Sequence, residues 1–320
     1  MTSPSVARAA PTQQTLRPAS RMTLASVVRG KLQQPIRVVL YGVEGIGKST
    51  FGASAPSPIF LGAEDGTAQL DVARFPKPES FADVFEAIRV LGTSEHDFKT
   101  LVVDTLDWLE PIIWAHICER DKQENIEAYG YGKGYQTALD EWRKVLAALE
   151  RLRQAKGMHL VLVAHSWVKS FKNPTGDDFD RYEMKLHAKA GGLVKEWADA
   201  VLFANYETYA HKDEKTKRVR GVDTGARLLF SERRAAWDAK NRYSLPESLP
   251  LSWADFEAAV NAAHVAPTVD LRAEITRKAK ELGEDTESKV LIALEKAGDN
   301  AQHLAVINNR LNALLAEREN

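Results

Sequence analysis

The sequence predicts an α/β fold, with a mostly parallel sheet flanked by helices and a small helical region after it. Continuous apolar runs of strand length recur at residues 36–41, 58–63, 100–104 and 159–164. Runs of this kind suit strands that are buried on both faces of a parallel sheet. Between the last two runs, residues 136–156 carry apolar side chains at the three- and four-residue spacing of an amphipathic helix. Alternating strands and helices favour a parallel sheet with right-handed crossovers.

The rest of the chain divides into a strand-rich part and a helical part. Residues 200–211, 217–222 and 226–230 are predicted to form shorter strands, some of them antiparallel at the sheet edge. Beyond a break near residues 264–270, the pattern indicates two or three amphipathic helices. We therefore expect an N-terminal arm at 1–34, a core at 35–265 and a C-terminal helical region at 266–320.

Composition excludes several classes of protein. The chain has 44% hydrophobic and 27% charged residues, as soluble globular proteins do. Its 43 Lys and Arg against 44 Asp and Glu exclude a uniformly basic protein that coats nucleic acid, although a local basic groove stays open. Cys118 is the single cysteine, which excludes a disulfide framework and a cysteine-rich zinc site. The sequence therefore predicts a cytoplasmic protein, and no apolar run is long enough for a membrane span.

The first 43 residues contain basic residues but no acidic ones. They carry six cations: Arg8, Arg17, Arg21, Arg29, Lys31 and Arg37. Within them, residues 1–34 are rich in Ala, Ser, Thr, Pro and Gln and show no clear apolar period. A segment of this composition indicates a flexible basic arm. An organelle transit peptide has a similar composition. An arm that contacts DNA or straps one subunit to another is a further possibility.

The most specific motif directly follows the first predicted strand. Residues 42–49 read G-x-x-x-x-G-K-S, which is a phosphate-binding loop between a strand and a helix. Glycines let successive backbone N–H groups surround a phosphate, and the lysine reaches the β- and γ-phosphates. The motif predicts a nucleoside triphosphate site made by Gly42, Val43, Glu44, Gly45, Ile46, Gly47, Lys48, Ser49 and Thr50.

Two carboxylates at strand ends complete the expected site. Asp104 ends the apolar run TLVVD, where it is expected to hold Mg²⁺ together with the hydroxyl of Ser49. Glu64 follows the run at 58–63, at the edge of a parallel sheet where ligands bind. A carboxylate there polarises an attacking water, whereas a solvated turn is the plainer interpretation of Glu64.

A pair of cations follows the late strands. Lys240 and Arg242 are one residue apart, so on an extended segment they project to the same side. Such a pair is suited to clamp a γ-phosphate. An exposed basic pair without a function is the alternative.

The set GVEGIGKST, FLGAEDG, TLVVDTLDW, VLVAHS and AKNRYSLPE resembles RecA-like P-loop ATPases. It most resembles the phage-encoded Sak-type single-strand-annealing recombinases, over roughly residues 24–257, and more distantly bacterial RecA and the replicative hexameric helicases. The resemblance implies a RecA-like core that uses ATP and Mg²⁺, with Glu64 as the catalytic glutamate. It also implies that His165 is a γ-phosphate sensor, although RecA has a glutamine there and a structural histidine is the alternative.

The resemblance also implies a shared active site and a nucleic-acid partner. Lys240 and Arg242 look like a trans-acting finger, which requires a homo-oligomer, either a ring or a filament. Two segments match the DNA-binding loops of the family, at 128–136 and 166–189. Tyrosines, glycines and lysines in them suit base stacking and phosphate contact, with the candidates Tyr131, Lys133, Tyr135, Lys169, Lys172 and Arg181. Tyrosines packed under the core are the alternative for the first segment.

The leading hypothesis is an oligomeric ATPase that binds single-stranded DNA and promotes annealing or strand exchange. Its compartment is the bacterial host cytoplasm if a phage encodes it, and a single-strand-binding protein is an expected partner by analogy. A replicative helicase or helicase loader is the alternative among motor enzymes. A nucleotide-dependent switch with little catalysis, or a small-molecule kinase, is the alternative from another class.

Overall fold

The computed structural model describes residues 23–27, 32, 34–62, 66–212, 219–264, 271–297 and 301–319. The chain divides into two compact units, Met1–Gln33 and Gln34–Asn320. In the first unit, a single turn of 3-10 helix at Leu24–Ser26 is described. Most of the arm predicted for residues 1–34 lies outside the described residues.

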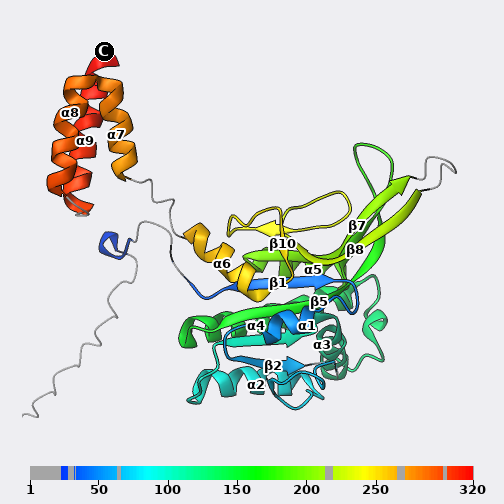
Figure 1. The fold of residues 1–320 in the computed structure, drawn as a ribbon. Coiled ribbons are helices and arrows are strands. Elements are labelled where there is room, and N and C mark those ends of the chain that lie inside the picture. Colours follow the sequence, from blue (N-terminus) through cyan, green and yellow to red (C-terminus); the bar gives the residue numbers. More distant parts are fainter. Residues whose placement is uncertain are drawn as a thin grey trace, which may run out of the picture. The chain divides into compact units, whose positions relative to one another are not determined.

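The second unit is built on a mixed sheet whose centre is parallel (Figure 1). The strands occur in the order β10-β8-β7-β1-β5-β4-β2-β3, and pairing is parallel from β7 to β3. Their bounds are β1 Arg37–Gly42, β2 Pro58–Gly62, β3 Ala73–Arg74, β4 Thr100–Asp104, β5 His159–Phe171, β7 Ala200–Lys212, β8 Val219–Phe230 and β10 Ser248–Pro250. Two further strands, β6 (Phe179–Met184) and β9 (Lys240–Asn241), pair antiparallel with β5 and β7. The predicted α/β fold with a mostly parallel sheet is confirmed.

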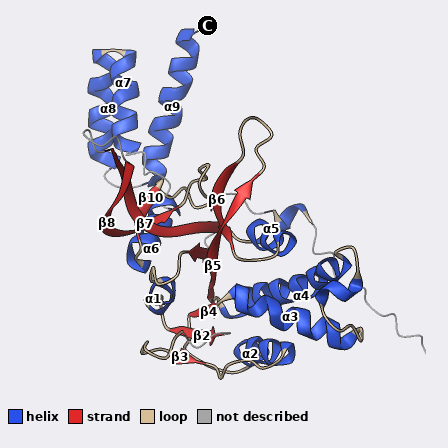
Figure 2. Ribbon diagram, turned by 90° about the vertical axis from the view of Figure 1, so that its right-hand side faces the viewer, coloured by secondary structure: helices blue, strands red, loops and turns tan. Residues whose placement is uncertain are grey.

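Helices cover both faces of the sheet (Figure 2). Alternate residues of β1 enter different cores: Val39 and Tyr41 pack with one cluster, and Val38 and Leu40 with the other. The first cluster is covered by α2 (Phe81–Thr93), α3 (Leu106–Arg120), α4 (Lys133–Lys156) and α5 (Ala188–Trp197). The second is covered by α1 (Lys48–Ala53) and α6 (Trp253–His264). Burial on both faces explains why the strands read as continuous apolar runs.

Two β-hairpins lie where the sequence predicts a loop or shorter strands. The loop predicted within residues 166–189 is wrong, because β5 continues to Phe171 and pairs with β6 from Ser166↔Met184 to Phe171↔Phe179. The strands predicted at 217–222 and 226–230 are one strand, β8. It stays a single strand because the long strand β7 supplies pairing partners along most of its length.

The glycine-rich segment before α4 is more ordered than predicted. Residues Ile126–Tyr129 form a 3-10 helix, η2, and α4 begins at Lys133 rather than at 136. Gly132 precedes α4 with a φ of 68°, a left-handed conformation that glycine adopts without steric cost. Lys133 therefore lies in the first turn of a helix.

The C-terminal region contains α7 (Leu271–Leu282), α8 (Glu284–Ala297) and α9 (Ala301–Glu319). These helices share an apolar cluster of their own, made by Ile275, Ala279, Val290, Leu294, Leu304 and Leu311. The two or three amphipathic helices predicted here are therefore three in the described part of the chain. No helix among the described residues is both long and apolar enough to cross a lipid bilayer.

Candidate functional site

The phosphate-binding loop connects β1 to α1 through backbone positions that only glycine fits. A Cβ on Gly42 would lie 2.2 Å from the carbonyl oxygen of Ala204 in β7. Gly47 has a φ of 110°, in the left-handed region. Between them, the fully buried side chain of Ile46 anchors the loop in the core. Lys48 is buried too, and its ammonium donates to the carbonyl oxygens of Gly42 (3.2 Å) and Val43 (2.9 Å). The loop thus holds its lysine against its own backbone.

Ser49 and Asp104 meet where β4 ends. The Ser49 hydroxyl donates to Oδ2 of Asp104 over 2.6 Å. Burial raises the pKa of Asp104, although the Ser49 hydrogen bond and the charge of Lys48 oppose that rise. Within the described residues, the buried Oδ1 of Asp104 has no hydrogen-bond partner. A buried carboxylate oxygen without a partner is costly, and a cation would satisfy it.

This arrangement fits a magnesium ion that arrives with a nucleotide. In the part of the chain that the structure describes, no group of three or more His, Cys, Asp or Glu side chains could hold a metal by itself. Mg²⁺ accepts one or two protein oxygens when phosphate oxygens and waters complete its coordination. Ser49 and Asp104 are the residues that would hold it.

His165 reaches the same site from the middle of β5. Its backbone N–H donates to Oδ1 of Asp107 over 3.0 Å, and its Nδ1 lies 2.8 Å from Oδ2 of that carboxylate. Burial raises the pKa of Asp107, but the hydrogen bonds from His165 outweigh it, and the pKa is lowered overall. An ionised Asp107 therefore fixes the His165 ring in one orientation. Asp107 was not predicted as a site residue, although it stands three residues after Asp104.

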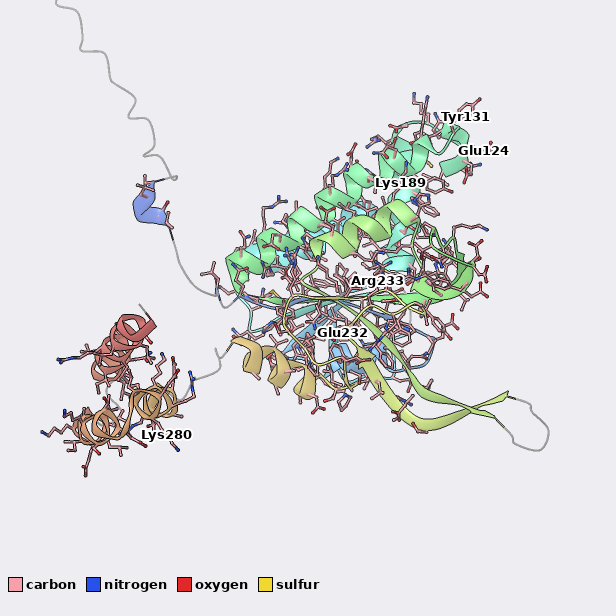
Figure 3. All side chains as sticks on the ribbon, turned by 90° about the horizontal axis from the view of Figure 1, so that it is seen from above. Glu124, Tyr131, Lys189, Glu232, Arg233 and Lys280 are labelled. Carbon is pink, nitrogen blue, oxygen red and sulfur yellow. The ribbon has the colours of Figure 1, made fainter. Side chains whose placement is uncertain are left out.

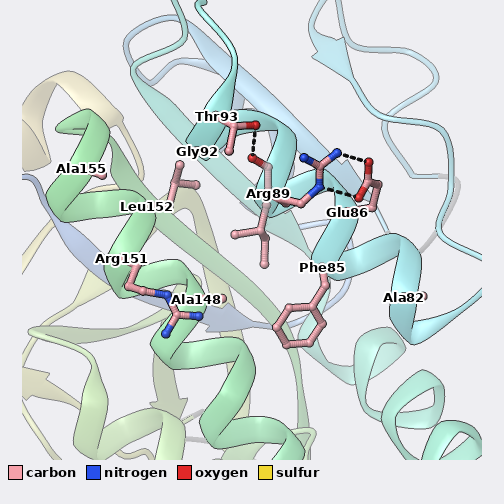
Figure 4. A pocket seen from close by; sticks show the side chains of 11 residues that line it. Ala82, Phe85, Glu86, Arg89, Gly92, Thr93, Ala148, Arg151, Leu152 and Ala155 are labelled. Atoms are coloured by element: carbon pink, nitrogen blue, oxygen red, sulfur yellow. Dashed lines mark hydrogen bonds and ion pairs between the residues drawn. The ribbon is translucent and has the colours of Figure 1, made fainter. Parts of the chain in front are cut away.

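These groups line a cavity of about 290 Å³. Its walls also include Gly66, which ends the FLGAEDG motif, and Gln69 and Leu70, which no sequence motif marks. Glu64, the expected catalytic carboxylate, lies outside the described residues, and its role stays a prediction. A larger cavity of about 600 Å³ lies between α2 and α4 (Figure 4). Its lining is mainly apolar, and its Arg89 is paired with Glu86, so it offers no comparable chemistry.

The family of the chain follows from its sequence. A family model described as AAA domain matches residues 34–243. That span is more than half of the 320 residues. The chain belongs to the AAA domain family. Among solved structures, it resembles the crystal structure of the RadB recombinase, with a TM-score of 0.37 and 13% identity, over 63% of this chain and 84% of that chain. No curated protein matches the chain.

The residues matched to the AAA domain contain the phosphate loop, Asp104 and His165. The cavity therefore belongs to a P-loop ATPase domain. The other described candidate site residues lie outside this cavity. Three of them make contacts that the sequence does not predict.

Lys240 is the first of these. Its ammonium donates to the carbonyl oxygens of Lys195, Glu196 and Ala198 at 2.9, 2.7 and 2.6 Å. These carbonyls lie at the C-terminal end of α5, where a cation is stabilised by the helix dipole. The expectation that Lys240 projects as half of a phosphate clamp is wrong for this structure, because the lysine caps a helix. Arg242 is half exposed, with one contact of 3.4 Å to Asp199.

The segment before α4 places its aromatic residues in two ways. Tyr131 is fully exposed at the N-terminal end of α4, beside exposed Lys133 (Figure 3). Tyr135 instead stacks on His187 with ring centroids 4.0 Å apart, and its hydroxyl donates to Glu127. Tyr135 therefore has a packing role, which is the alternative that the sequence left open, and its contact with DNA stays a prediction.

The three cations of the β5–β6 hairpin also differ in their contacts and burial. Lys169 lies over the ring of Trp167, 3.8 Å from its centroid, and Lys172 pairs with Asp178 at 2.5 Å. Arg181 is only 4% exposed, and it lies over the ring of Phe171. The expectation that Arg181 contacts DNA is wrong for this structure, because its side chain is buried.

Proposed function

We propose that this chain is an ATP-hydrolysing, RecA-like protein that acts on single-stranded DNA as a homo-oligomer. The observation that carries the proposal is the Ser49–Asp104 pair beside Lys48, with one buried carboxylate oxygen left for a cation. Annealing or strand exchange is the activity that we infer, by resemblance to the Sak-type recombinases.

Each residue of the cavity has a distinct part in binding and hydrolysis. Lys48 leaves the loop carbonyls and pairs with the β- and γ-phosphates, whose charge it offsets. Ser49 and Asp104 hold Mg²⁺, which when bound neutralises charge that develops on the phosphate oxygens. His165, which Asp107 orients at the wall of the cavity, donates a hydrogen bond to the terminal phosphate, in the sensor role that the sequence resemblance gives it. Glu64 orients the attacking water, in the role that the sequence resemblance gives it.

A surface at the carboxyl edge of the sheet supports single-stranded DNA as the partner. The β5–β6 hairpin and the start of α4 both lie at this edge, since α4 leads back into β5. Exposed Tyr131 offers a ring face to a base, and Lys169 and Lys172 offer charge to phosphates. We call this set, with Lys133, the strand-binding surface. It lies beyond the β5 residue, His165, that faces the nucleotide cavity.

Arg242 supports an oligomer because it lies at the wrong end of the sheet to serve its own nucleotide. It directly follows β9, whose Asn241 pairs with Ala200, and Ala200 pairs with Val38 near the start of β1. The phosphate loop follows the other end of β1. We infer that this half-exposed arginine serves the nucleotide of a neighbouring subunit, as an arginine finger supplied in trans does.

ATP hydrolysis measured over a range of protein concentrations, with and without single-stranded DNA, tests the proposal. We expect turnover per chain to rise with concentration and to rise again with DNA. Tight ATP binding without turnover under any of these conditions would support the nucleotide-dependent switch instead. Absence of ATP binding would overturn the assignment of the cavity.

A further inference from the structure

Arg227 of β8 lies against the outside of the phosphate-binding loop. A Cβ on Gly47 would lie 3.3 Å from Nη1 of Arg227 and 3.6 Å from Cδ2 of Leu251. Arg227 pairs in register with Tyr206, two residues beyond Ala204, the partner of Gly42. It therefore lies at the carboxyl edge of the sheet, where the loop is.

The strand order places Arg227 opposite the metal-binding end of the site. Counting from β1, β4 is two strands away on one side and β8 is two strands away on the other. Asp104 ends β4, and with Lys48 and His165 it marks the position of the terminal phosphate. We expect the other end of a bound nucleotide, which carries the nucleoside, to extend away from Asp104, toward the side where Arg227 lies.

The backbone of Arg227 is fixed by its neighbours, whereas the residue as a whole is exposed. Its strand is paired with β7 on one side, and on the other its carbonyl oxygen accepts a hydrogen bond of 2.9 Å from the N–H of Leu251. The guanidinium carbon lies 5.9 Å from the ring centroid of Tyr206, which packs against the core. A planar cation held over an aromatic ring, on an exposed residue, is suited to stack on a nucleobase.

We propose that Arg227 binds the base of the nucleotide held in the same chain, with the Tyr206 ring supporting the guanidinium from below. The proposal rests on the nucleotide site assigned above and extends it from the phosphates to the nucleoside. It gives the β7–β8 hairpin a direct contact with the bound nucleotide, separate from the contacts made by Lys48 and Asp104.

Calorimetric binding of ATP and of inorganic tripolyphosphate to the full chain tests it. Arg227→Ala weakens ATP binding about tenfold and leaves tripolyphosphate binding unchanged, because tripolyphosphate has no base. The KM for ATP rises by a similar factor while kcat stays within about twofold, since Arg227 lies away from the terminal phosphate. Arg143→Ala, at an exposed arginine of α4 paired with Asp140, is the matched control and changes neither ligand.

Arg227→Lys separates stacking from simple charge. It keeps the charge but loses the plane, so we expect it to recover little of the lost ATP affinity. Full recovery by lysine, or an equal loss for tripolyphosphate, would overturn the base contact and indicate a phosphate contact. Wild-type ATP affinity in a folded Arg227→Ala protein would overturn the inference alone. A wild-type chain that binds neither ligand would overturn the proposed function, and the inference with it.

Discussion

The phosphate-binding loop and the strand-binding surface lie at the same edge of the sheet but hold their polar groups in opposite ways. In the loop, Lys48 is buried and its ammonium is fixed by backbone carbonyls, and the neighbouring Asp104 at the end of β4 is 1% exposed. On the strand-binding surface, Tyr131 is fully exposed and Lys172 is held by one ion pair.

Because of this difference, substitutions in the two regions should have different effects. Buried groups with defined partners act as a unit, so removing one disables the whole site. Exposed groups contribute separately and are weakened by salt. The loop is therefore suited to chemistry, and the surface to graded binding of a polymer.

The largest effect is expected at an exposed cation, Arg242. It would break the comparison, because the loss of an exposed group would then disable the site. Arg242→Ala is expected to lower ATP turnover on the order of 10³-fold, as the loss of other arginine fingers does. Binding of ATP should change little, because Arg242 lies at the edge of the sheet away from its own loop. Steady-state turnover and ATP affinity of the variant are the measurements.

An experiment that mixes two variants tests whether Arg242 acts on the nucleotide of a neighbouring subunit. Arg242→Ala chains supply an intact loop, and Lys48→Ala chains supply an intact arginine. Together the two inactive proteins should recover part of the activity. If they assemble together without any recovery, Arg242 acts in its own subunit or has no part in turnover.

A somewhat smaller loss is expected at the loop itself. Lys48→Ala removes the ammonium that offsets charge on the β- and γ-phosphates, and turnover should fall about 10²- to 10³-fold. Lys99→Ala is the matched control, since Lys99 is exposed at the opposite edge of the sheet, next to the start of β4. Unchanged turnover in a folded Lys48→Ala protein would contradict the loop assignment.

Glu110 of α3 sharpens the comparison by testing what burial does to a carboxylate. Burial, with a contribution from the charge of Asp107, raises the pKa of Glu110 to about 7 from an ordinary value of 4.5. The unfolded chain therefore loses this proton first as the pH rises, and the free energy of unfolding falls between pH 4.5 and about 7. Glu110→Gln cannot ionise, so its stability relative to wild type should increase across that window by about 3 kcal/mol.

Urea unfolding at pH 5 and at pH 8 measures this change. Glu119→Gln, on an exposed position of the same helix, should show no such dependence. An equal difference between wild type and Glu110→Gln at both pH values would mean that Glu110 ionises normally in the folded protein.

The smallest effects are expected on the strand-binding surface. Tyr131→Ala should weaken single-stranded DNA binding by about 1–3 kcal/mol through the loss of one stacked base. Lys172→Ala should instead lower the slope of affinity against salt by about one. Fluorescence anisotropy at several salt concentrations measures both. Unaltered DNA affinity in both folded variants would leave the proposed surface without support.

What the sequence predicts well is local. The loop motif is contiguous, and Asp104 ends an apolar run, so their positions follow from the pattern alone. Asp107 was missed because its partner, His165, is 58 residues away and meets it only when β4 and β5 pair.

The errors likewise come from tertiary contacts. Lys240 looks like an exposed cation in sequence, but the carbonyls that bind it belong to a helix packed beside it. Arg181 is covered in the same way, because β5 and β6 pair and bring Phe171 under its guanidinium. No local pattern of charge and hydrophobicity records which surface of a hairpin faces the core.

The ion pairs around Asp199 bear on how easily Arg242 can serve a neighbour. Asp199 accepts two hydrogen bonds from Arg37, at 3.1 and 2.8 Å, besides its longer contact with Arg242. If Arg242 left this contact, as the proposed role in a neighbouring subunit requires, Asp199 would keep its principal counter-charge and no buried anion would be left unpaired. In the proposed oligomer, Arg37 would therefore let Arg242 leave Asp199 at little electrostatic cost, without disturbing the strand that leads into the loop.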